Sequence, residues 1–360
     1  MAEFVDGLEL SRRFFGEAVR PVLDHAFPRL KYSAALIGWG SEVLGFDTPR
    51  SSDHHWGPRA LLFVGEKDFG AARRIGDALA HGLPHEFIGY STSFGDPEPN
   101  GVRVPLKIKD GPVRHMVQVF TVRSFFQARL GVDPYKKLSI ADWLTFPQQR
   151  LLEIASGAVY HDGLDLEKVR RKFAFYPDDL WLYMLAAQWK KISQEEAFVG
   201  RAGEVGDELG SRILAARLVR EIMRLCFLME RRYAPYSKWL GSAFAKMKIG
   251  RKLSPVLVEA LSANDWKRRE RAMSKAYGIV ARAQNSLGIT PPVPTTTSNY
   301  FGRPFKVIHA DKISEEIRKE IKSPAVRMIT ADFGAVDQFA DSSDLLNDLD
   351  ACRRLNDIYR

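Results

Sequence analysis

The spacing of apolar residues changes near Gly131, and this change constrains the fold more than any other feature of the sequence. Before Gly131, short apolar runs of strand length alternate with stretches in which apolar residues recur every three or four positions. After it, almost all of the apolar spacing is helical. The sequence therefore predicts an α+β protein, with a mixed sheet and flanking helices first and a mostly helical bundle second.

The length and composition fit more than one folded domain. The chain has 360 residues, of which 45% are hydrophobic, and a domain commonly takes about 150 residues. A rigid segment, Pro291–Pro294 followed by three threonines, marks a boundary late in the chain. We predict a mixed-sheet domain at 1–135, a helical bundle at 136–290, and a linker with an acidic extension at 291–360.

Apolar spacing and turn residues also predict the individual elements. In the first domain we expect helices over 8–26 and 69–80 and strands over 32–37, 59–64, 86–93 and 114–122. A long helix of the second domain is expected to include the apolar residues from Leu209 to Leu228. It is apolar on two faces, which is typical of the central helix of a bundle.

Positive charge is concentrated in the middle of the chain. The formal net charge is +9, which favours anionic partners such as nucleotides, nucleic acids or acidic surfaces without choosing among them. Residues 210–275 hold 16 Lys and Arg against 5 Asp and Glu, whereas residues 331–360 hold 7 Asp and 3 Arg. The acidic tail could fold back against the basic region; alternatively, the basic region is simply a solvated face.

Simple features argue against a secreted or membrane-bound chain. The two cysteines, Cys226 and Cys352, do not have the spacing of a disulfide framework or a metal knuckle. Acidic residues near the N-terminus interrupt any signal-peptide core, and no stretch of about 18 apolar residues is present to span a membrane. We therefore expect a cytoplasmic protein with no membrane partner.

Residues 38–59 carry the strongest sign of chemistry. A buried strand delivers Gly40 and Ser41 into a tight turn, where glycine lets the backbone approach a phosphate and the serine hydroxyl and N–H groups hold its oxygens. Asp53 and His55 follow at the expected start of the next strand, and residues two apart in a strand point the same way. We therefore predict Asp53 and His55 as catalytic residues and metal ligands facing the Gly40-Ser41 loop.

Each of these residues also has a purely structural interpretation. Gly40 and Ser41 form an ordinary tight turn in many proteins, and an aspartate after a serine, as at Asp53, often caps a turn. His55 is then a surface residue. The paired spacing favours the site, because the loop and the Asp-x-His pair are separated by only a dozen residues.

The motifs of this stretch resemble the signature of the nucleotidyltransferase superfamily, a Gly-Ser loop followed by Ser-Asp-x-Asp. That superfamily includes polymerase β and the aminoglycoside nucleotidyltransferases. The chain resembles more closely a bacterial family of unknown function with the same fold, at 44–47, 53–59 and 232–239, and the likeness spans nearly the whole chain. The resemblance implies a nucleotidyltransferase-type sheet domain followed by a helical domain.

The resemblance also implies an activity. It would be transfer of a nucleoside monophosphate from a nucleoside triphosphate to a hydroxyl or amine of a small-molecule acceptor, with Mg²⁺ or Mn²⁺ as cofactor. Gly40, Ser41 and Arg59 would then bind the nucleotide and its phosphates. The helical domain would supply further groups, for which we name Arg232, Tyr236 and Lys238. Alternatively, these last three residues belong to a packed helix junction.

The chain departs from the superfamily pattern at two positions. Members that catalyse transfer usually have aspartate where His55 stands, and a third carboxylate on a later strand, where Gln118 is the best match. An Asp/His pair suits manganese or zinc better than magnesium, which prefers oxygen ligands. Four other acidic residues are candidate substitutes: Glu42, Asp47, Glu86 and Asp96.

These departures leave two other functions open. One is a catalytically degenerate protein of this fold that binds a nucleotide or regulates a partner, which the missing carboxylates support. The other is a nucleic-acid-binding protein that uses the basic region. We do not favour it, because no RNA-recognition or helix-turn-helix signature is present.

Overall fold

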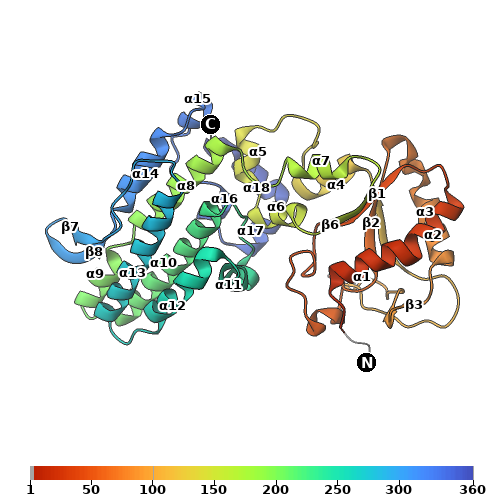
Figure 1. The fold of residues 1–360 in the computed structure, drawn as a ribbon, viewed down its shortest axis with the longest axis horizontal. Helices are drawn as coiled ribbons and strands as arrows, with labels where there is room; N and C mark the ends of the chain where they lie inside the picture. The colour runs from red at the N-terminus through yellow and green to blue at the C-terminus, as the bar shows by residue number, and fades with distance from the viewer. Residues whose placement is uncertain (1–3, 100, 360) are drawn as a thin grey trace. The chain divides into compact units, whose positions relative to one another are not determined.

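The computed structural model describes residues 4–99 and 101–359 and divides the chain into two compact units (Figure 1). The first unit takes Met1–Lys137 and Arg150–Ala174, and the second takes Leu138–Gln149 and Phe175–Arg360. The α+β class is confirmed. The chain crosses between the units three times, whereas the sequence suggested domains that follow one another, and residues 291–360 are part of the second unit.

A mixed four-stranded sheet is the centre of the first unit. Its strand order is β5-β2-β1-β6, with β1 antiparallel to both β2 and β6, and β2 parallel to β5. The strands are β1 (Tyr32–Leu36), β2 (Arg59–Val64), β5 (Met116–Phe120) and β6 (Ala158–Asp162). The first three were expected at these places. Strand β6 was not, because it follows the point at which the apolar spacing becomes helical.

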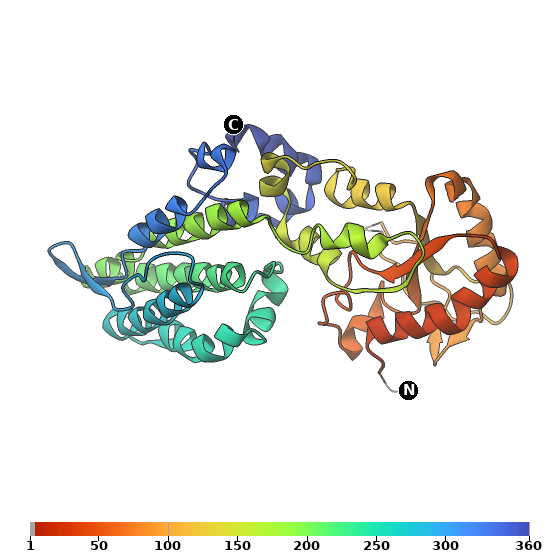
Figure 2. The ribbon, with the colours of Figure 1, turned by 45° about the horizontal axis from the view of Figure 1, so that its top comes forward.

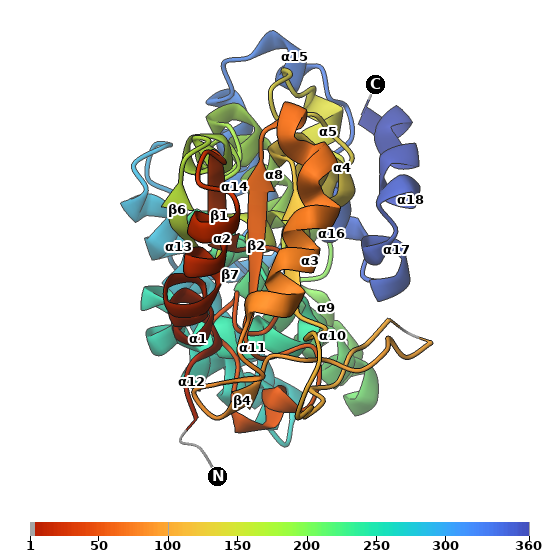
Figure 3. The same ribbon diagram turned by 90° about the vertical axis from the view of Figure 1, so that its right-hand side faces the viewer.

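Helices cover both faces of this sheet. On one face, apolar side chains of the sheet such as Leu62 and Val64 form one core with residues of α1, α2 and α3, which lie beside β1 and β2 in Figure 3. On the other face, Phe63 meets Phe125 of α4 with their ring centroids 5.3 Å apart. The bounds are α1 (Gly7–Phe14), a π-helical turn (Phe15–Val19), α2 (Arg20–Ala26), α3 (Ala72–Gly82), α4 (Val122–Leu130) and α7 (Leu166–Arg171).

The strand expected over 86–93 is wrong. The chain forms a tight hairpin there, with β3 (Glu86–Phe87) and β4 (Tyr90–Ser91) on either side of Ile88 and Gly89. Both turn residues have positive φ angles, 51° and 79°. Apolar residues on both sides of the turn imitate one continuous strand in the sequence, and Gly89 is the only sign of the reversal.

The second unit is a helical bundle built around α8, α10 and α13. The long helices lie side by side (Figures 1 and 2), and α8 is buried on nearly every side. A buried hydrogen bond joins two of them: Trp189 of α8 donates from Nε1 to the Gln284 amide oxygen of α13 at 3.1 Å. The expected central helix over 209–228 is confirmed as α10.

The remaining elements complete this bundle. The longer helices are α8 (Asp178–Ser193), α9 (Phe198–Glu204), α10 (Glu208–Met229), α11 (Ser237–Ala245), α12 (Lys248–Ser262), α13 (Trp266–Ser286) and α14 (Ala310–Lys319). The shorter elements are α5 (Ile140–Thr145), the hairpin β7 (Ser298–Tyr300) and β8 (Arg303–Val307), α15 (Pro324–Arg327), α16 (Val336–Phe339), α17 (Ser343–Asn347) and α18 (Leu349–Arg354). Helix α6 (Gln148–Ala155) begins in the second unit and ends in the first. Within the described residues, no helix is both long and apolar enough to cross a membrane.

A buried carboxyl group attaches α14 to the bundle. Glu196, in the turn after α8, accepts hydrogen bonds from the backbone N–H of Ile308 at 2.7 Å and of Ala310 at 3.1 Å. Burial raises the pKa of Glu196 to about 7, and the two N–H groups oppose this rise. Protonation of Glu196 is therefore easier in the folded chain than in the unfolded one.

We predict that this carboxyl makes stability fall with rising pH. Because the folded pKa lies above the unfolded value of 4.5, the contribution is fully present below pH 4.5 and is lost as pH rises through about 7. Relative to Glu196→Gln, the wild type should lose about 3 kcal/mol of unfolding free energy over that range. Urea unfolding of both proteins at a series of pH values measures the difference, and parallel profiles would contradict it.

Candidate functional site

The loop after β1 has a backbone that only glycine adopts easily. Gly38 and Gly40 have φ angles of 91° and 136°, and the Gly38 N–H donates to the Glu153 carbonyl at 2.8 Å. The carbonyl of Ser41 then accepts from the N–H groups of Leu44 and Phe46, which closes a turn. The turn predicted at Gly40 and Ser41 is therefore present.

A buried ion pair lies beneath this loop. Glu42 and Arg59, whose side chains are 3% and 4% exposed, are joined by Nε and Nη2 contacts of 2.7 and 2.5 Å to one carboxylate oxygen. Arg59 also donates to the Trp39 carbonyl at 2.7 Å, and its guanidinium lies 4.1 Å from the centre of the Trp39 ring. Arg59 therefore fixes the loop through its contacts with Glu42 and Trp39.

The close approach of this pair explains why glycine stands at position 40. A Cβ atom built on Gly40 would lie 2.3 Å from Nη2 of Arg59 and 2.6 Å from a carboxylate oxygen of Glu42. Both atoms are fixed by the ion pair and cannot move away without breaking it. Glycine is thus required at position 40 for packing against the ion pair, whether or not a ligand binds the loop.

The loop also presents a row of backbone donors. Within the part of the chain that the structure describes, the N–H groups of Gly40, Ser41 and Glu42 make no hydrogen bond, and neither does the Ser41 hydroxyl. Gly40 and Ser41 are half-buried, whereas Glu42 is buried. Consecutive unpaired N–H groups beside a hydroxyl are the donors with which glycine loops bind phosphate oxygens.

Asp53 does not lie at the start of a strand, and that prediction is wrong. It is the last residue of a 3₁₀ helix, Pro49–Asp53, and β2 begins only at Arg59. The capping box between Thr48 and Ser51 starts this helix. The Asp53 carboxylate is 65% exposed and contacts Nδ1 of His54 at 2.6 Å. Asp53 therefore pairs with its neighbour in the sequence.

His55 is held by a different segment. Its backbone has a φ of 49°, its N–H donates to the Arg103 carbonyl at 2.9 Å, and Nε2 lies 3.0 Å from the Gly101 carbonyl. The ring also meets Trp39 edge-on, with centroids 4.8 Å apart. Because Nε2 faces a carbonyl, it carries the proton, and Nδ1 is left as a free acceptor.

The free Nδ1 is the feature of His55 that would allow it to bind a metal ion. Nδ1 is buried and has no hydrogen-bond partner among the described residues. Burial lowers the pKa of His55, with smaller contributions from the positive charges of Arg59 and Arg103. The imidazole is therefore neutral near pH 7, with a lone pair available at Nδ1.

The candidate substitute carboxylates do not gather around Asp53. Glu42 is bound to Arg59, and Asp47 accepts from the Gly7 N–H and from Trp56 Nε1 at 2.8 and 3.0 Å. Asp96 forms an ion pair with Arg114, Glu86 lies on β3, and Gln118 is exposed on β5. In the described ranges, no three His, Cys, Asp or Glu side chains come together to hold a metal ion.

Arg232, Tyr236 and Lys238 belong to the second unit, at the junction of α10 and α11. Two glutamines at the start of α6 hold this junction. The amide oxygens of Gln148 and Gln149 accept from the backbone N–H groups of Ala234 and Tyr236 at 2.9 and 3.0 Å. All three predicted side chains are exposed, and Lys238 lies 4.9 Å from the ring centre of Trp239.

These residues begin an acid-free stretch of the chain. From Arg231 to Val258 the sequence has seven basic residues and no acidic one, and all seven are exposed. They are Arg231, Arg232, Lys238, Lys246, Lys248, Arg251 and Lys252. These exposed basic side chains thus extend from the end of α10 to the start of α12.

Comparison with known families covers only part of the chain. Residues 143–240 match a family described as a domain of unknown function, DUF4037. This range includes the junction at 232–239 but not the Gly40-Ser41 loop or Asp53. No curated protein matches the chain.

Replacing Gly40 should cost more stability than replacing Gly45, a glycine of the same loop with free space around it. Gly45 also has a positive φ, 68°, but no atom lies within 4 Å of a Cβ built there. We expect Gly45→Ala to cost about 1 kcal/mol. Gly40→Ala should cost about 3 kcal/mol or more, because its φ of 136° is harder for alanine to adopt and because the new Cβ displaces Arg59. Urea unfolding of both variants decides, and equal losses would refute the packing role of Gly40.

Glu42→Gln should destabilise the first unit strongly, because it leaves the buried Arg59 charge without an anion. Removing one partner of a buried ion pair typically costs about 3–5 kcal/mol. The matched control is Glu17→Gln, which breaks the exposed pair between Glu17 and Arg13 and should leave stability unchanged. Thermal unfolding followed by circular dichroism compares them; a small effect of Glu42→Gln would mean that the ion pair does not hold the loop.

Proposed function

We propose that the first unit is a nucleotidyltransferase-type domain that binds a nucleoside triphosphate at the Gly40-Ser41 loop and acts by binding, as a sensor or regulatory protein. The observation that supports this most directly is the row of unpaired donors at Gly40, Ser41 and Glu42. The Glu42–Arg59 ion pair fixes the backbone that carries these donors. A loop already held in shape loses little entropy when it binds an anion.

Asp53 is the single protein carboxylate that we assign to a metal ion brought with the triphosphate. It is exposed and lies on the same connection between β1 and β2 as the loop. A divalent cation would neutralise phosphate charge there. The described residues do not supply the further carboxylates that two-metal transfer uses, and this favours binding over turnover.

The second candidate function is nucleotidyl transfer to a hydroxyl or amine of a small molecule. The free Nδ1 of His55 supports it, because a neutral imidazole nitrogen is a good ligand for manganese. In this case Asp53 and His55 both hold the metal when the nucleotide is bound. The transferase requires a pyrophosphate product, whereas the binding protein does not.

A third candidate function is nucleic-acid binding by the acid-free basic stretch of the second unit. Exposed Lys and Arg side chains with Tyr236 nearby in the sequence are groups that bind phosphates and stack on bases. We rank this below nucleotide binding, because the stretch carries no element that reads bases.

Nucleotide binding should depend on Asp53 and Ser41. With Mg²⁺ or Mn²⁺ present, we expect saturable binding of a nucleoside triphosphate by calorimetry, weakened about tenfold by Asp53→Ala or Ser41→Ala, since each removes a contact to a charged ligand. The control is Asp24→Ala, because Asp24 is 61% exposed and pairs with Arg20 much as Asp53 pairs with His54. Its affinity should equal that of the wild type.

Pyrophosphate release measured in the same samples separates the two candidates. No release alongside binding supports the sensor. Release that disappears in both Asp53→Ala and His55→Ala establishes the transferase. If no nucleoside triphosphate binds the wild type, both candidates are wrong.

A further inference from the structure

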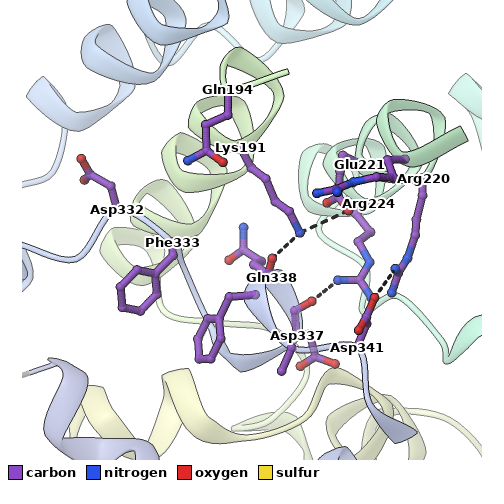
Figure 4. A pocket seen from close by; sticks show the side chains of 13 residues that line it. Lys191, Gln194, Arg220, Glu221, Arg224, Asp332, Phe333, Asp337, Gln338 and Asp341 are labelled. Atoms are coloured by element: carbon purple, nitrogen blue, oxygen red, sulfur yellow. Dashed lines mark hydrogen bonds and ion pairs between the residues drawn. The ribbon is translucent and has the colours of Figure 1, made fainter. Parts of the chain in front are cut away.

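The second unit contains a cavity that the proposed function does not use. It has a volume of about 440 Å³ and lies between α8, α10 and the C-terminal segment 332–341 (Figure 4). The segment is fastened over it by hydrogen bonds: Lys191 donates to the Gln338 carbonyl at 2.5 Å, and Arg224 donates to the Asp337 carbonyl. Arg220 and Asp341 form an ion pair of 2.9 Å at one end.

The acidic tail therefore does fold back on the basic helix α10. The tail neutralises only part of the positive charge of that helix. Asp341 neutralises Arg220, but Arg224 meets the tail through a backbone carbonyl, which carries no net charge.

Most charged groups at the cavity have an ionic partner. Lys191 and Glu221 are 3.2 Å apart. Two more pairs reach outward, from Arg217 to Glu195 at 2.9 Å and from Asp332 to Arg318 at 2.5 Å. With the pair of Arg220 and Asp341, these contacts account for three of the four cations and three of the four acids.

The fourth acid, Asp337, forms no ion pair with any residue that the structure describes. Its carboxyl is buried and accepts the backbone N–H of Gln148 at 2.8 Å. Burial raises the pKa of Asp337, and the nearby charge of Arg224 opposes this only in part. Asp337 therefore attracts Arg224 from beyond ion-pair distance and does not pair with it directly.

Arg224 is the remaining cation. Its Nε is buried and has no hydrogen-bond partner in the part of the chain that the structure describes, and no carboxylate lies within ion-pair distance of it there. Burial lowers the pKa of Arg224, although the charges of Glu221, Asp337 and Asp341 oppose this from beyond ion-pair distance. The cost of burying this guanidinium is therefore only partly compensated. An anionic group in the cavity would remove that cost by accepting from Arg224.

The opposite side of the cavity is aromatic. Phe333 and Phe339 both line it, are 41% and 39% exposed, and meet edge to face with centroids 5.1 Å apart. Figure 4 shows Phe333 across the cavity from Arg220 and Arg224. Two half-exposed aromatic rings favour an apolar or planar group beside the anion.

From these contacts we infer that the cavity is a binding site for a small organic anion, with one carboxylate or phosphate group bound by Arg224 and an apolar or aromatic body packed on Phe333 and Phe339. The volume suits a ligand of this kind, since small-molecule sites usually measure about 300–1,000 Å³. The site lies wholly within the second unit and is independent of nucleotide binding by the first.

The test is calorimetric titration of the full chain with four probes: phenyl phosphate, phenylacetate, inorganic phosphate and benzyl alcohol. We expect phenyl phosphate or phenylacetate to bind, and the tighter of the two identifies the anionic group. Benzyl alcohol, which has the ring without the charge, should not bind. Inorganic phosphate, which has the charge without the ring, should bind more weakly than phenyl phosphate.

Two variants test the assigned contacts. Arg224→Gln should weaken binding of the aromatic anion about tenfold or more, whereas Arg212→Gln, an exposed arginine of the same helix, should not change it. If Arg224→Gln does not fold, Phe333→Ala decides, because it removes a half-exposed ring and should weaken phenyl phosphate but not inorganic phosphate.

The inference is overturned if neither aromatic anion binds the wild type, if benzyl alcohol binds as well as they do, or if the affinity survives Arg224→Gln. Equal affinity of Phe333→Ala for phenyl phosphate would also overturn it.

Discussion

The ion pair of Glu42 and Arg59 is the interaction on which the candidate site depends. Both side chains are buried, so neither can exchange its partner for water without a large cost. The pair fixes Trp39 through its carbonyl and ring and requires glycine at position 40. The segment that contains Gly38 and Gly40 is thereby held in one conformation, in which its backbone donors remain available to a ligand.

These contacts explain why few carboxylates near the loop are available to bind a metal ion. The carboxylates nearest in sequence are already engaged in holding the fold: Glu42 binds Arg59, and Asp47 binds the start of α1 and Trp56. Asp53 is left as an exposed group and His55 as a neutral nitrogen base. Under the proposed function, this set would bind a metal-nucleotide complex through its phosphates but would supply little charge to stabilise a transferring phosphoryl group.

Much of the fold could be predicted from apolar spacing. Strands β1 and β2 and helix α10 lie where that spacing placed them, because each buries a long continuous surface. The hairpin at 86–93 and strand β6 could not be predicted in this way, since a positive φ at Ile88 and pairing with the distant strand β1 leave no periodic sign. The turn at Gly40 could be predicted from the sequence. The expected convergence of Asp53 and His55 in a strand is wrong, and its failure could not be foreseen from their spacing. A capped 3₁₀ helix ends at Asp53, and backbone contacts with Gly101 and Arg103 hold His55 separately. One signal was available for Arg59: a charged residue that opens a wholly apolar strand needs a buried partner.

Amide hydrogen exchange of the full chain, with and without a nucleoside triphosphate and Mn²⁺, tests the central claim most directly. If the loop binds the phosphates, the amides of Gly40, Ser41 and Glu42, which have no internal acceptor among the described residues, should exchange more slowly with ligand present. Unchanged exchange at these three amides, under conditions in which calorimetry shows the nucleotide bound, would place the nucleotide elsewhere and contradict the account.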